Sequence, residues 1–530
     1  MAGSPTSNPR VNIQLLPAAL VDAFEDRRCI IFGQTGPGGA AVSEALNINL
    51  HTATDAEIQA LFGTSDLYWK ILAWRNGAQV SDGGIVPTLD VISVAPAGGA
   101  VAAASTITFA GAATAAGSYT VSIVDEKEFT VIVPVANGDA DTVVAAAVNA
   151  AINLLTDAPF SSSVLLGVVT ITADDVGTLG NDYGVRVTGV VTNQTAVLTA
   201  FTGGVTDPVL TSVLDAIDGR RYTGAQWPES WVVTTIADEF AARFNVANDI
   251  LDGVVFQGST DTFANNTALV APLNNQALVI MGNNISATAL DKGPSILQPA
   301  DWVASFFMAV RDKRLSTGAL IADLIVAQNA PQDALGGPAL ASLPYFNTPL
   351  TDTPVTGSVN LYNSTEQIEL ENDGFTSFGV NTVGNAMLMG PVVTTWTTDA
   401  AGNANASFHY LNYVDTGSVC REIFFRTLKA VFSQHRLTEG NIVEGRAMTN
   451  ELGIKGELLN IYRVLANNAL TQAGSDAEAF FNTNTTVVVS LADRTVTING
   501  PLPIVTQLGT INYNLSLAFT VGQTGTQITL

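Results

Sequence analysis

Apolar residues recur along this chain at two spacings, one typical of strands and one typical of helices. After a polar arm over residues 1–20, a short apolar run over 28–33 predicts a buried strand. Helices are expected over 53–62 and 67–75, where apolar side chains recur every three or four residues. The folded part of the chain therefore begins with a core strand followed by two helices.

Between Asp90 and Gly204 the chain becomes rich in Ala, Gly, Thr and Val. Alternation of apolar and polar positions predicts short strands, and one amphipathic helix is expected over 140–155. We expect a compact strand-rich module inserted into the chain. Its predicted strands cover 106–109, 119–124, 129–135, 168–172 and 183–190.

From about residue 205 to 375 the pattern changes again, because helical segments alternate with buried strands. This alternation predicts an α/β layered domain. Its predicted helices cover 210–217, 237–251, 263–269 and 299–311, and its strands cover 231–234, 254–257 and 277–281. A linker rich in Pro, Gly and Thr is expected over 331–357.

The C-terminal third is predicted to mix strands with long helices. Strands are expected over 379–393, 395–398, 485–491 and 495–498, and helices over 416–437 and 451–469. The last strand, Ile511–Val521, alternates cleanly for eleven residues. Its apolar face holds Ile511, Tyr513, Leu515, Leu517, Phe519 and Val521.

Two interpretations of this last strand stay open on sequence grounds. It is either a terminal strand of the chain's own sheet or a strand donated to a neighbouring subunit. In the second case backbone hydrogen bonds supply the affinity and the alternating side chains supply the register.

Composition suggests that much of the surface is covered by other protein. Apolar residues make up 47% of the chain and charged residues only 13%, and the mean hydropathy is +0.29. The formal net charge of −25 argues against binding nucleic acid through a broad basic face. No continuous apolar run predicts a membrane span, and the polar N-terminus does not have the pattern of a secretory signal.

Candidate chemistry is sparse, and no enzyme activity, cofactor or metal is expected. The glycine run over 33–39 follows a strand but lacks the Lys and Ser or Thr of a phosphate-binding loop. His51, His409 and His435 have no metal-ligand spacing, and no Gly-x-Ser-x-Gly elbow is present. The two cysteines, Cys29 and Cys420, make no disulfide framework.

Basic residues are sparse overall, but seven of them fall close together in the helical C-terminal region. A solvated helix face is the ordinary explanation, and a face that docks on an acidic partner is the alternative. The cluster comprises Arg421, Arg426, Lys429, Arg436, Arg446, Lys455 and Arg463.

Four stretches, in order along the chain, resemble the tail sheath proteins of contractile-tailed phages, particularly the Mu-like branch. They are Cys29-Ile-Ile-Phe-Gly-Gln-Thr-Gly36, the turn Gly177-Thr-Leu-Gly-Asn-Asp-Tyr-Gly-Val-Arg186, the entry Gly203-Gly-Val-Thr-Asp-Pro-Val-Leu210 with the following Leu214-Asp-Ala-Ile217, and the helix Ser418–Leu437. Each motif alone is weak, but their order and spacing together are fairly specific.

The resemblance implies an α+β multidomain fold with a central α/β domain and a strand-rich outer insertion. It also implies an inner α+β domain that the N- and C-terminal parts of the chain build jointly, with extended terminal arms. The expected boundaries are an N-terminal arm over 1–20, a first inner-domain segment over 21–89, the insertion over 90–204, the central domain over 205–375, a second inner-domain segment over 376–502 and a C-terminal arm over 503–530.

The function implied by the resemblance is structural. Subunits stack as hexameric rings around an inner tube, link through strand exchange, and contract to drive the tube through the host envelope for genome ejection. The implied partners are further copies of the chain, the tail tube protein, and baseplate and tail terminator proteins. The implied location is the virion, after assembly in the host cytoplasm.

Several residues gain expected roles from this resemblance. Val11, Ile13 and Leu15 mark an N-terminal arm strand, and the alternating strand 511–521 marks the C-terminal arm. Arg421, Arg426 and Lys429 are candidate tube-facing residues. Cys29 and Cys420 both fall in the expected inner domain, either as buried thiols or as a disulfide within or between subunits.

Rival functions make different demands on the sequence. The sheath of a phage-like bacterial injection device would have the same sequence features. A tube protein would be shorter, and a secreted surface-layer protein would carry a signal peptide. A hydrolase that used the α/β domain would need a nucleophile elbow or clustered ligands.

Overall fold

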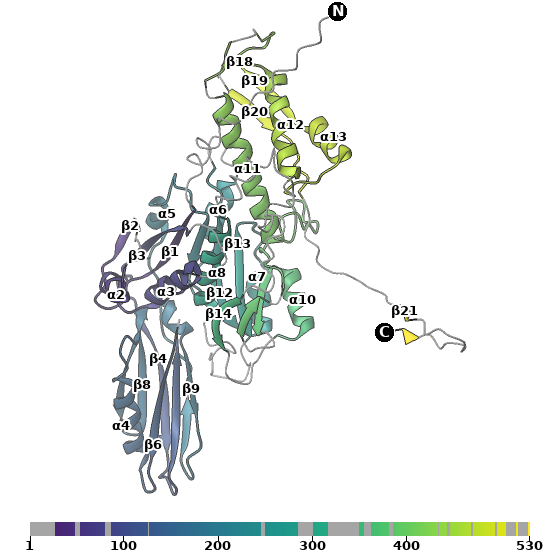
Figure 1. Ribbon diagram of the computed structural model, residues 1–530. Coiled ribbons are helices and arrows are strands. Elements are labelled where there is room, and N and C mark those ends of the chain that lie inside the picture. Colours follow the sequence, from purple (N-terminus) through teal and green to yellow (C-terminus); the bar gives the residue numbers. More distant parts are fainter. Residues whose placement is uncertain are drawn as a thin grey trace, which may run out of the picture.

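The computed structural model describes most of the folded chain. The described residues are 27–47, 53–79, 86–125, 127–244, 250–284, 300–315, 349–354, 362–380, 385–388, 390–432, 434–442, 446–467, 470–492, 495–504, 516–517 and 528–529. They form an elongated body in which a large central sheet lies between a strand-rich unit and a bundle of helices (Figure 1).

A nine-stranded sheet forms the centre of the molecule. Its six inner strands are parallel, and the three strands at its edges pair antiparallel. In spatial order the strands are β14 (Pro349–Pro354), β16 (Asn385–Leu388), β15 (Phe375–Val380), β13 (Leu278–Asn284), β12 (Val254–Asp261), β11 (Gly224–Trp227), β1 (Arg28–Gln34), β3 (Thr88–Val94) and β2 (Val42–Asn47).

The order of the parallel strands is that of a doubly wound sheet. From β1 the chain moves to β3 on one side, then returns to β11 on the other side and continues outward to β12, β13 and β15. The direction of winding therefore reverses between β1 and β11. In open α/β sheets this reversal, at the carboxyl ends of the strands, is where ligands bind.

Helices cover both faces of this sheet. One face carries α2 (Asp55–Phe62), α3 (Asp66–Gln79) and α8 (Ala300–Leu315), and the other carries α5 (Thr211–Asp215), α6 (Thr234–Arg243), α7 (Phe263–Val270) and α10 (Ser364–Asp373). Strand β1 explains the two layers, because its side chains alternate between them. Cys29 and Ile31 enter the core of the first face, while Ile30 and Phe32 enter that of the second.

Helices α3 and α8 approach each other closely because Gly77 of α3 has no side chain. A Cβ atom added there would lie 2.3 Å from the carbonyl oxygen of Phe306 in α8.

Capping fixes the start of α2, since Thr54 and Glu57 form a reciprocal capping box.

The inserted unit (residues 101–205) leaves the central domain after β3 and returns before α5. An isolated bridge between Val101 and Val205 closes its neck. Two antiparallel sheets and one helix enclose its core. The first sheet holds β10 (Thr195–Leu198), β4 (Ala102–Ala110), β8 (Val168–Val176) and β7 (Phe160–Leu165), the second holds β6 (Glu128–Val135), β5 (Gly117–Val124) and β9 (Gly184–Thr188), and α4 (Asp141–Ile152) and the short helix η2 (Thr178–Asp182) complete the unit.

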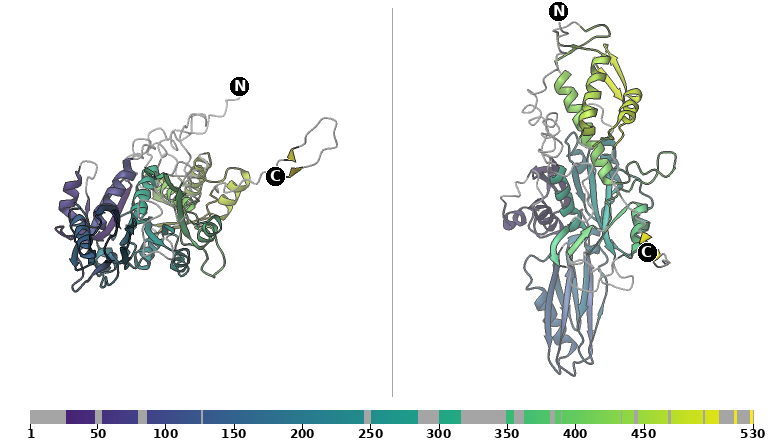
Figure 2. Two further views of the ribbon diagram at one scale, coloured as in Figure 1. Left: turned by 90° about the horizontal axis from the view of Figure 1, so that it is seen from below. Right: turned by 45° about the vertical axis from the view of Figure 1, so that its right-hand side comes forward.

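Helix α11 (Leu411–Phe432) connects the central sheet to the C-terminal unit at the opposite end of the body, as Figure 2 also shows. Buried residues of its first half join the main core, and Phe424 and Leu428 pack against both this core and the core of the C-terminal unit. That unit consists of β17 (Arg436–Leu437), β18 (Met448–Thr449), α12 (Glu451–Asn467), α13 (Ser475–Asn484), β19 (Thr486–Ser490) and β20 (Thr495–Asn499).

The structure differs from the expected domain boundaries at the N-terminal side. The described portion of residues 21–89 supplies β1 to the middle of the central sheet, along with α2 and α3 on one of its faces. Strand β3 also belongs to this sheet, so the insertion begins after it and not at residue 90. Parallel pairing of β1 is the physical reason, because it ties this segment to β3 along the whole strand and to β11 over Cys29–Ile31.

Two predicted strands, over 231–234 and 395–398, are wrong, and the second range holds only an isolated bridge from Thr398 to Ala404. Trp231 and Val233 are buried, but they lie in a turn and at the start of α6, and the strand of this region is β11. The predicted linker 331–357 also contains β14, an edge strand that begins and ends with proline.

Candidate functional site

The place where a doubly wound sheet would hold a ligand is filled here by the inserted unit. Gln34, the last residue of β1, is only 1% exposed, and its Nε2 donates to the carbonyl oxygen of Val176 at 3.2 Å. The inserted unit thus lies over the carboxyl end of β1, next to the reversal of winding. We call this contact the carboxyl-edge joint.

A buried charge cluster lies beside this contact. Lys70 of α3 is fully buried, and its Nζ lies 2.7 Å from Asp66 Oδ2 and 3.2 Å from Asp301 Oδ2. Asp301 begins α8 and also accepts backbone N–H groups from Gly258 at 2.7 Å and Glu229 at 2.8 Å. The cluster therefore fastens α3, α8 and the carboxyl ends of β11 and β12 together.

Asp175 of the inserted unit completes this cluster. Its Oδ2 accepts the backbone N–H of Asp66 at 3.2 Å and the hydroxyl of Tyr183 at 2.7 Å. Burial, with a smaller contribution from the nearby Asp66 carboxylate, raises the pKa of Asp175 to about 8. Burial also raises the pKa of Asp66, although Lys70 opposes that shift.

A second set of buried charges, the amino-edge joint, fastens α11 to the opposite edge of the sheet. Arg311 of α8 pairs with Asp415 of α11 through two nitrogens, and its Nε lies 3.0 Å from Asp415 Oδ2. The same guanidinium donates to the carbonyl oxygen of Thr223 at 2.9 Å and to Asp312 Oδ1 at 2.6 Å. This arginine therefore connects α11 to the residue that precedes β11.

Glu422, further along α11, lies among three arginines. Its carboxylate is 2.7 Å from Arg221, 3.3 Å from Arg27 and 3.0 Å from Arg426. Burial acts to raise the pKa of Glu422, but the arginines outweigh burial and lower it to about 2. The carboxylate is therefore ionised at neutral pH and ties α11 to residues that flank β1 and β11.

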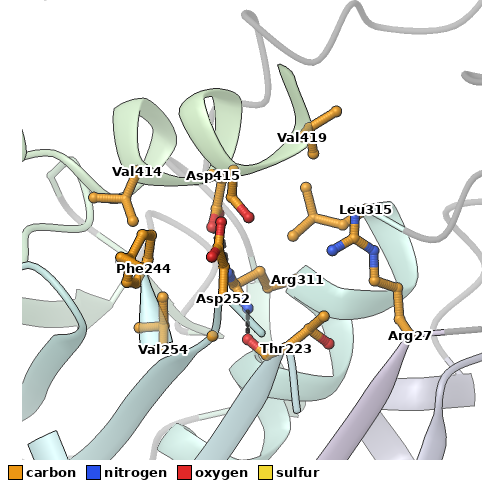
Figure 3. A pocket seen from close by; sticks show the side chains of 12 residues that line it. Arg27, Thr223, Phe244, Asp252, Val254, Arg311, Leu315, Val414, Asp415 and Val419 are labelled. Atoms are coloured by element: carbon orange, nitrogen blue, oxygen red, sulfur yellow. Dashed lines mark hydrogen bonds and ion pairs between the residues drawn. The ribbon is translucent and has the colours of Figure 1, made fainter. Parts of the chain in front are cut away.

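A small pocket opens at the amino-edge joint (Figure 3), with about 240 Å³ of empty space that includes open solvent. Asp415 and Val419 reach it from α11, and Arg27 and Thr223 from the amino ends of the strands. Its charged groups are paired across the joint, so the pocket marks the interface between α11 and the central sheet within the subunit.

The predicted tube-facing residues of α11 are partly engaged within the subunit. Arg421 lies 2.6 Å from Asp252 and also donates to the carbonyl oxygen of Phe244, while Arg426 pairs with Glu422. Lys429 is exposed, with its ammonium 5.6 Å from the ring centroid of Phe425. The tube-facing role of these three residues stays a prediction.

Both cysteines are free thiols and fully buried. Cys29 Sγ donates to Asp312 Oδ2 at 3.0 Å, and burial followed by this carboxylate raises the pKa of the thiol well above its usual value. Burial raises the pKa of Cys420 to about 12. Two enclosed, protonated thiols are poor candidates for a bond to a neighbouring subunit in this conformation.

The predicted arm strands lie mainly outside the described residues. Val11, Ile13 and Leu15 are outside them, as is most of the strand 511–521. Within that strand, Ser516 and Leu517 form β21, which pairs with β22 (Ile528–Thr529) of the same chain.

The features that first suggested chemistry have packing explanations. Gly36 and Gly39 lie against the turn between α2 and α3, where a Cβ on either would lie 2.2 Å from backbone atoms. His409 Nδ1 lies 2.8 Å from the Trp396 carbonyl oxygen, and His435 packs against Phe432. Among the described residues, no group of three or more His, Cys, Asp or Glu could hold a metal ion.

The helices in the described ranges of the chain are all unsuited to crossing a membrane. None of them is both long enough and apolar enough to span a bilayer.

Sequence reasoning found neither joint. The partners lie far apart in the chain, with Asp175 109 residues from Asp66 and Asp415 104 residues from Arg311. The available signal was an unusual choice of residues: Asp66 and Lys70 lie four apart in the first turns of α3, which are otherwise apolar or aromatic, and Arg311 and Asp312 directly follow the apolar run of α8.

Comparison with known proteins gives structural matches at low sequence identity. No protein-family model matches the chain, and no curated protein matches it. The chain is similar to the sheath tail protein of Desulfitobacterium hafniense, with 12% identity and a TM-score of 0.43 over 95% of this chain and 96% of that one. It is also similar to the sheath tail protein of Listeria innocua, with 13% identity and a TM-score of 0.42 over 93% and 96%. A match to the D1–D3 domains of the Escherichia coli flagellar cap protein has 15% identity and a TM-score of 0.11, over 34% and 70%.

Proposed function

We propose that this chain is a structural subunit of a contractile tail sheath. Copies stack as six-membered rings around an inner tube, and neighbouring subunits exchange terminal strands. Contraction then drives the tube through the host envelope. The ordered resemblance of four stretches to sheath proteins supports this proposal, and so does the acidic, apolar, weakly charged composition.

The observation that carries the proposal is the open hairpin β19–β20. It is a two-stranded sheet, and no other strand pairs with it in the described part of the chain. An isolated hairpin is marginally stable, and a third strand would cover its unpaired backbone groups. Its inner face packs on α12, while Val488 on the other face is 59% exposed.

A strand of suitable pattern lies just beyond this hairpin in the sequence. After β20 the chain turns aside, and Ile504 makes an isolated bridge with Thr471. Six residues, 505–510, separate Ile504 from the alternating strand 511–521, and fully extended they would span at most roughly 20 Å. A second copy's hairpin within this reach could receive the strand.

Strand exchange would link subunits that otherwise move as rigid bodies. The two joints support such rigidity, because buried hydrogen bonds from Asp66 and Gln34 hold the inserted unit, and the buried pair Arg311–Asp415 holds α11, on the central sheet. In this mechanism the sheath needs no cofactor, since the new interfaces formed in the contracted lattice supply the energy. The tube, baseplate and terminator proteins would be its other partners in the virion.

The decisive experiment is a truncation after Pro503, examined by negative-stain electron microscopy. Full-length protein is expected to form hollow striated cylinders, and the truncated chain to remain a folded monomer. A truncated chain that still builds cylinders would refute strand exchange by the C-terminal arm. If the truncation instead unfolds the C-terminal unit, the strand belongs to its own subunit.

A matched pair of substitutions refines this test. Leu517→Asp places a charge on the apolar face of the predicted strand, and Ser516→Asp places the same charge on its polar face. We expect only Leu517→Asp to abolish cylinders. Equal effects of the two variants would contradict the predicted register.

A further inference from the structure

We propose that one proton held at Asp175 keeps the inserted unit docked on the central sheet, and that loss of this proton opens the carboxyl-edge joint. The proposal concerns a single subunit and does not depend on assembly into a sheath. It rests on which groups neutralise each carboxylate at the joint.

The buried charges at this joint do not balance. Asp66 and Asp301 flank the single ammonium of Lys70, and a third carboxylate, Asp175, accepts the backbone N–H of Asp66 and is influenced by the charges of Asp66 and Lys70. If all three were ionised, the cluster would carry a net charge of −2 in a water-poor setting. Like charges this close strongly favour protonation of one member.

Asp175 is the member with the least support for a negative charge. Asp301 has Lys70 and two backbone N–H donors, and Asp66 has Lys70 at 2.7 Å. Asp175 has one backbone N–H and one hydroxyl on Oδ2. The buried Oδ1 atoms of Asp175 and Asp66 both lack a hydrogen-bond partner within the described chain, but Asp66 also has its contact with Lys70. The proton is therefore best placed on Asp175, which agrees with the raised pKa of about 8.

Among the described residues, the other ionisable groups near the joint do not supply a second cation for Asp175. Tyr183 donates its hydroxyl, Asp125 adds negative potential near Tyr183, and Glu229 accepts the backbone N–H of Thr260. Lys127, in the turn after β5, lies over the ring of Trp69 at 4.5 Å from its centroid. Asp174, the neighbour of Asp175 in β8, lies on the more exposed face of that strand.

The direction of the pH effect follows from the two states of the joint. In an opened joint Asp175 would meet water and titrate near its ordinary pKa of about 3.9. Because its pKa is raised in the docked state, docking is strongest at low pH and weakens as pH rises from about 4 to about 8. Loss of the proton to hydroxide gives water and a carboxylate without a cation. The docking constant then falls roughly tenfold per pH unit within this window and is level above it.

Hydrogen–deuterium exchange on the purified chain tests this proposal. Protection factors, corrected for intrinsic exchange rates, would be measured for peptides covering 62–70 and 173–185 between pH 6 and 8. We expect protection to fall by about 100-fold in the wild-type chain and to be independent of pH in Asp175→Asn. Peptides from α11 at the amino-edge joint serve as an internal control and should not respond.

Two further variants keep the test decisive. Asp157→Asn removes an exposed carboxylate that accepts from Gln59 at 2.8 Å across the same joint, and it should retain the wild-type pH response. Tyr183→Phe removes a hydrogen-bond donor that favours the charged form of Asp175. In this variant the decline of the protection factors should therefore continue to higher pH than in the wild-type chain. Constant protection in the wild-type chain, or the same decline in Asp175→Asn, would overturn the proposal.

Discussion

At the scale of single residues, the stability of the subunit depends on a few charged side chains that are buried away from solvent and paired with opposite charges. Glu422 is the best example, because three arginines from three different regions of the chain surround it. Removing one member of a buried ion pair leaves the others uncompensated, which is more damaging than the pair itself is stabilising.

We therefore expect Glu422→Ala to lower the free energy of unfolding by about 3–5 kcal/mol. The matched control is Glu478→Ala, because Glu478 pairs with Arg463 at 2.6 Å on the surface, where solvent screens the pair and its loss should change stability little. Urea denaturation followed by circular dichroism would measure both. Similar losses for the two variants would contradict the central role of Glu422.

The same carboxylate predicts some of the acid sensitivity of the fold. Its pKa is lowered to about 2 in the folded state, against about 4.3 when unfolded. Its stabilisation is thus complete above pH 4.3 and is lost as pH falls toward 2. Melting temperatures between pH 5 and 2 should therefore fall more steeply for the wild-type chain than for Glu422→Gln, and parallel curves would exclude this contribution.

At the scale of elements, close packing of α3 on α8 sets the first helical layer. Gly77→Ala places a Cβ 2.3 Å from the Phe306 carbonyl oxygen, so one helix must move, and we expect a loss of about 1–3 kcal/mol. Gly456→Ala, inside α12 with open space around its Cβ, should instead stabilise by about 0.5–1 kcal/mol. The melting temperature is expected to fall for Gly77→Ala and to rise for Gly456→Ala. Destabilisation by both substitutions would show that glycine itself is required in these helices.

Sequence patterns predicted elements well where burial alone decides them. Strand β1 and helices α3, α8 and α12 appear close to their expected places because their apolar positions are dense or periodic. Strand β11 was missed because it is only Gly-Ala-Gln-Trp, and its identity as a strand comes from its neighbours β1 and β12. The joints were missed for a related reason, since ion pairs between distant segments leave no periodic trace.

At the scale of the whole molecule, the fold distributes its rigidity unevenly. The parallel sheet anchors one unit at each of its edges, the inserted unit through Asp175 and α11 through Asp415 and Glu422. The inserted unit and the C-terminal unit are therefore rigidly attached at opposite ends of one central body (Figure 1). Forces applied at either end would be transmitted through these buried contacts.

The net charge of each subunit affects how readily two copies associate. Each copy carries a formal charge of −25, so long-range repulsion would oppose the proposed polymerisation, while apolar contacts and the proposed strand exchange would favour it. Raising the salt concentration from about 0.01 to about 0.15 M shortens the screening length from about 30 Å to about 8 Å. We expect the fraction that sediments as polymer to rise over this range, and the critical concentration to fall. The Leu517→Asp variant should gain little, because screening cannot restore an apolar strand face. Dissolution of wild-type polymers by salt would instead mean that ion pairs between subunits dominate the interface.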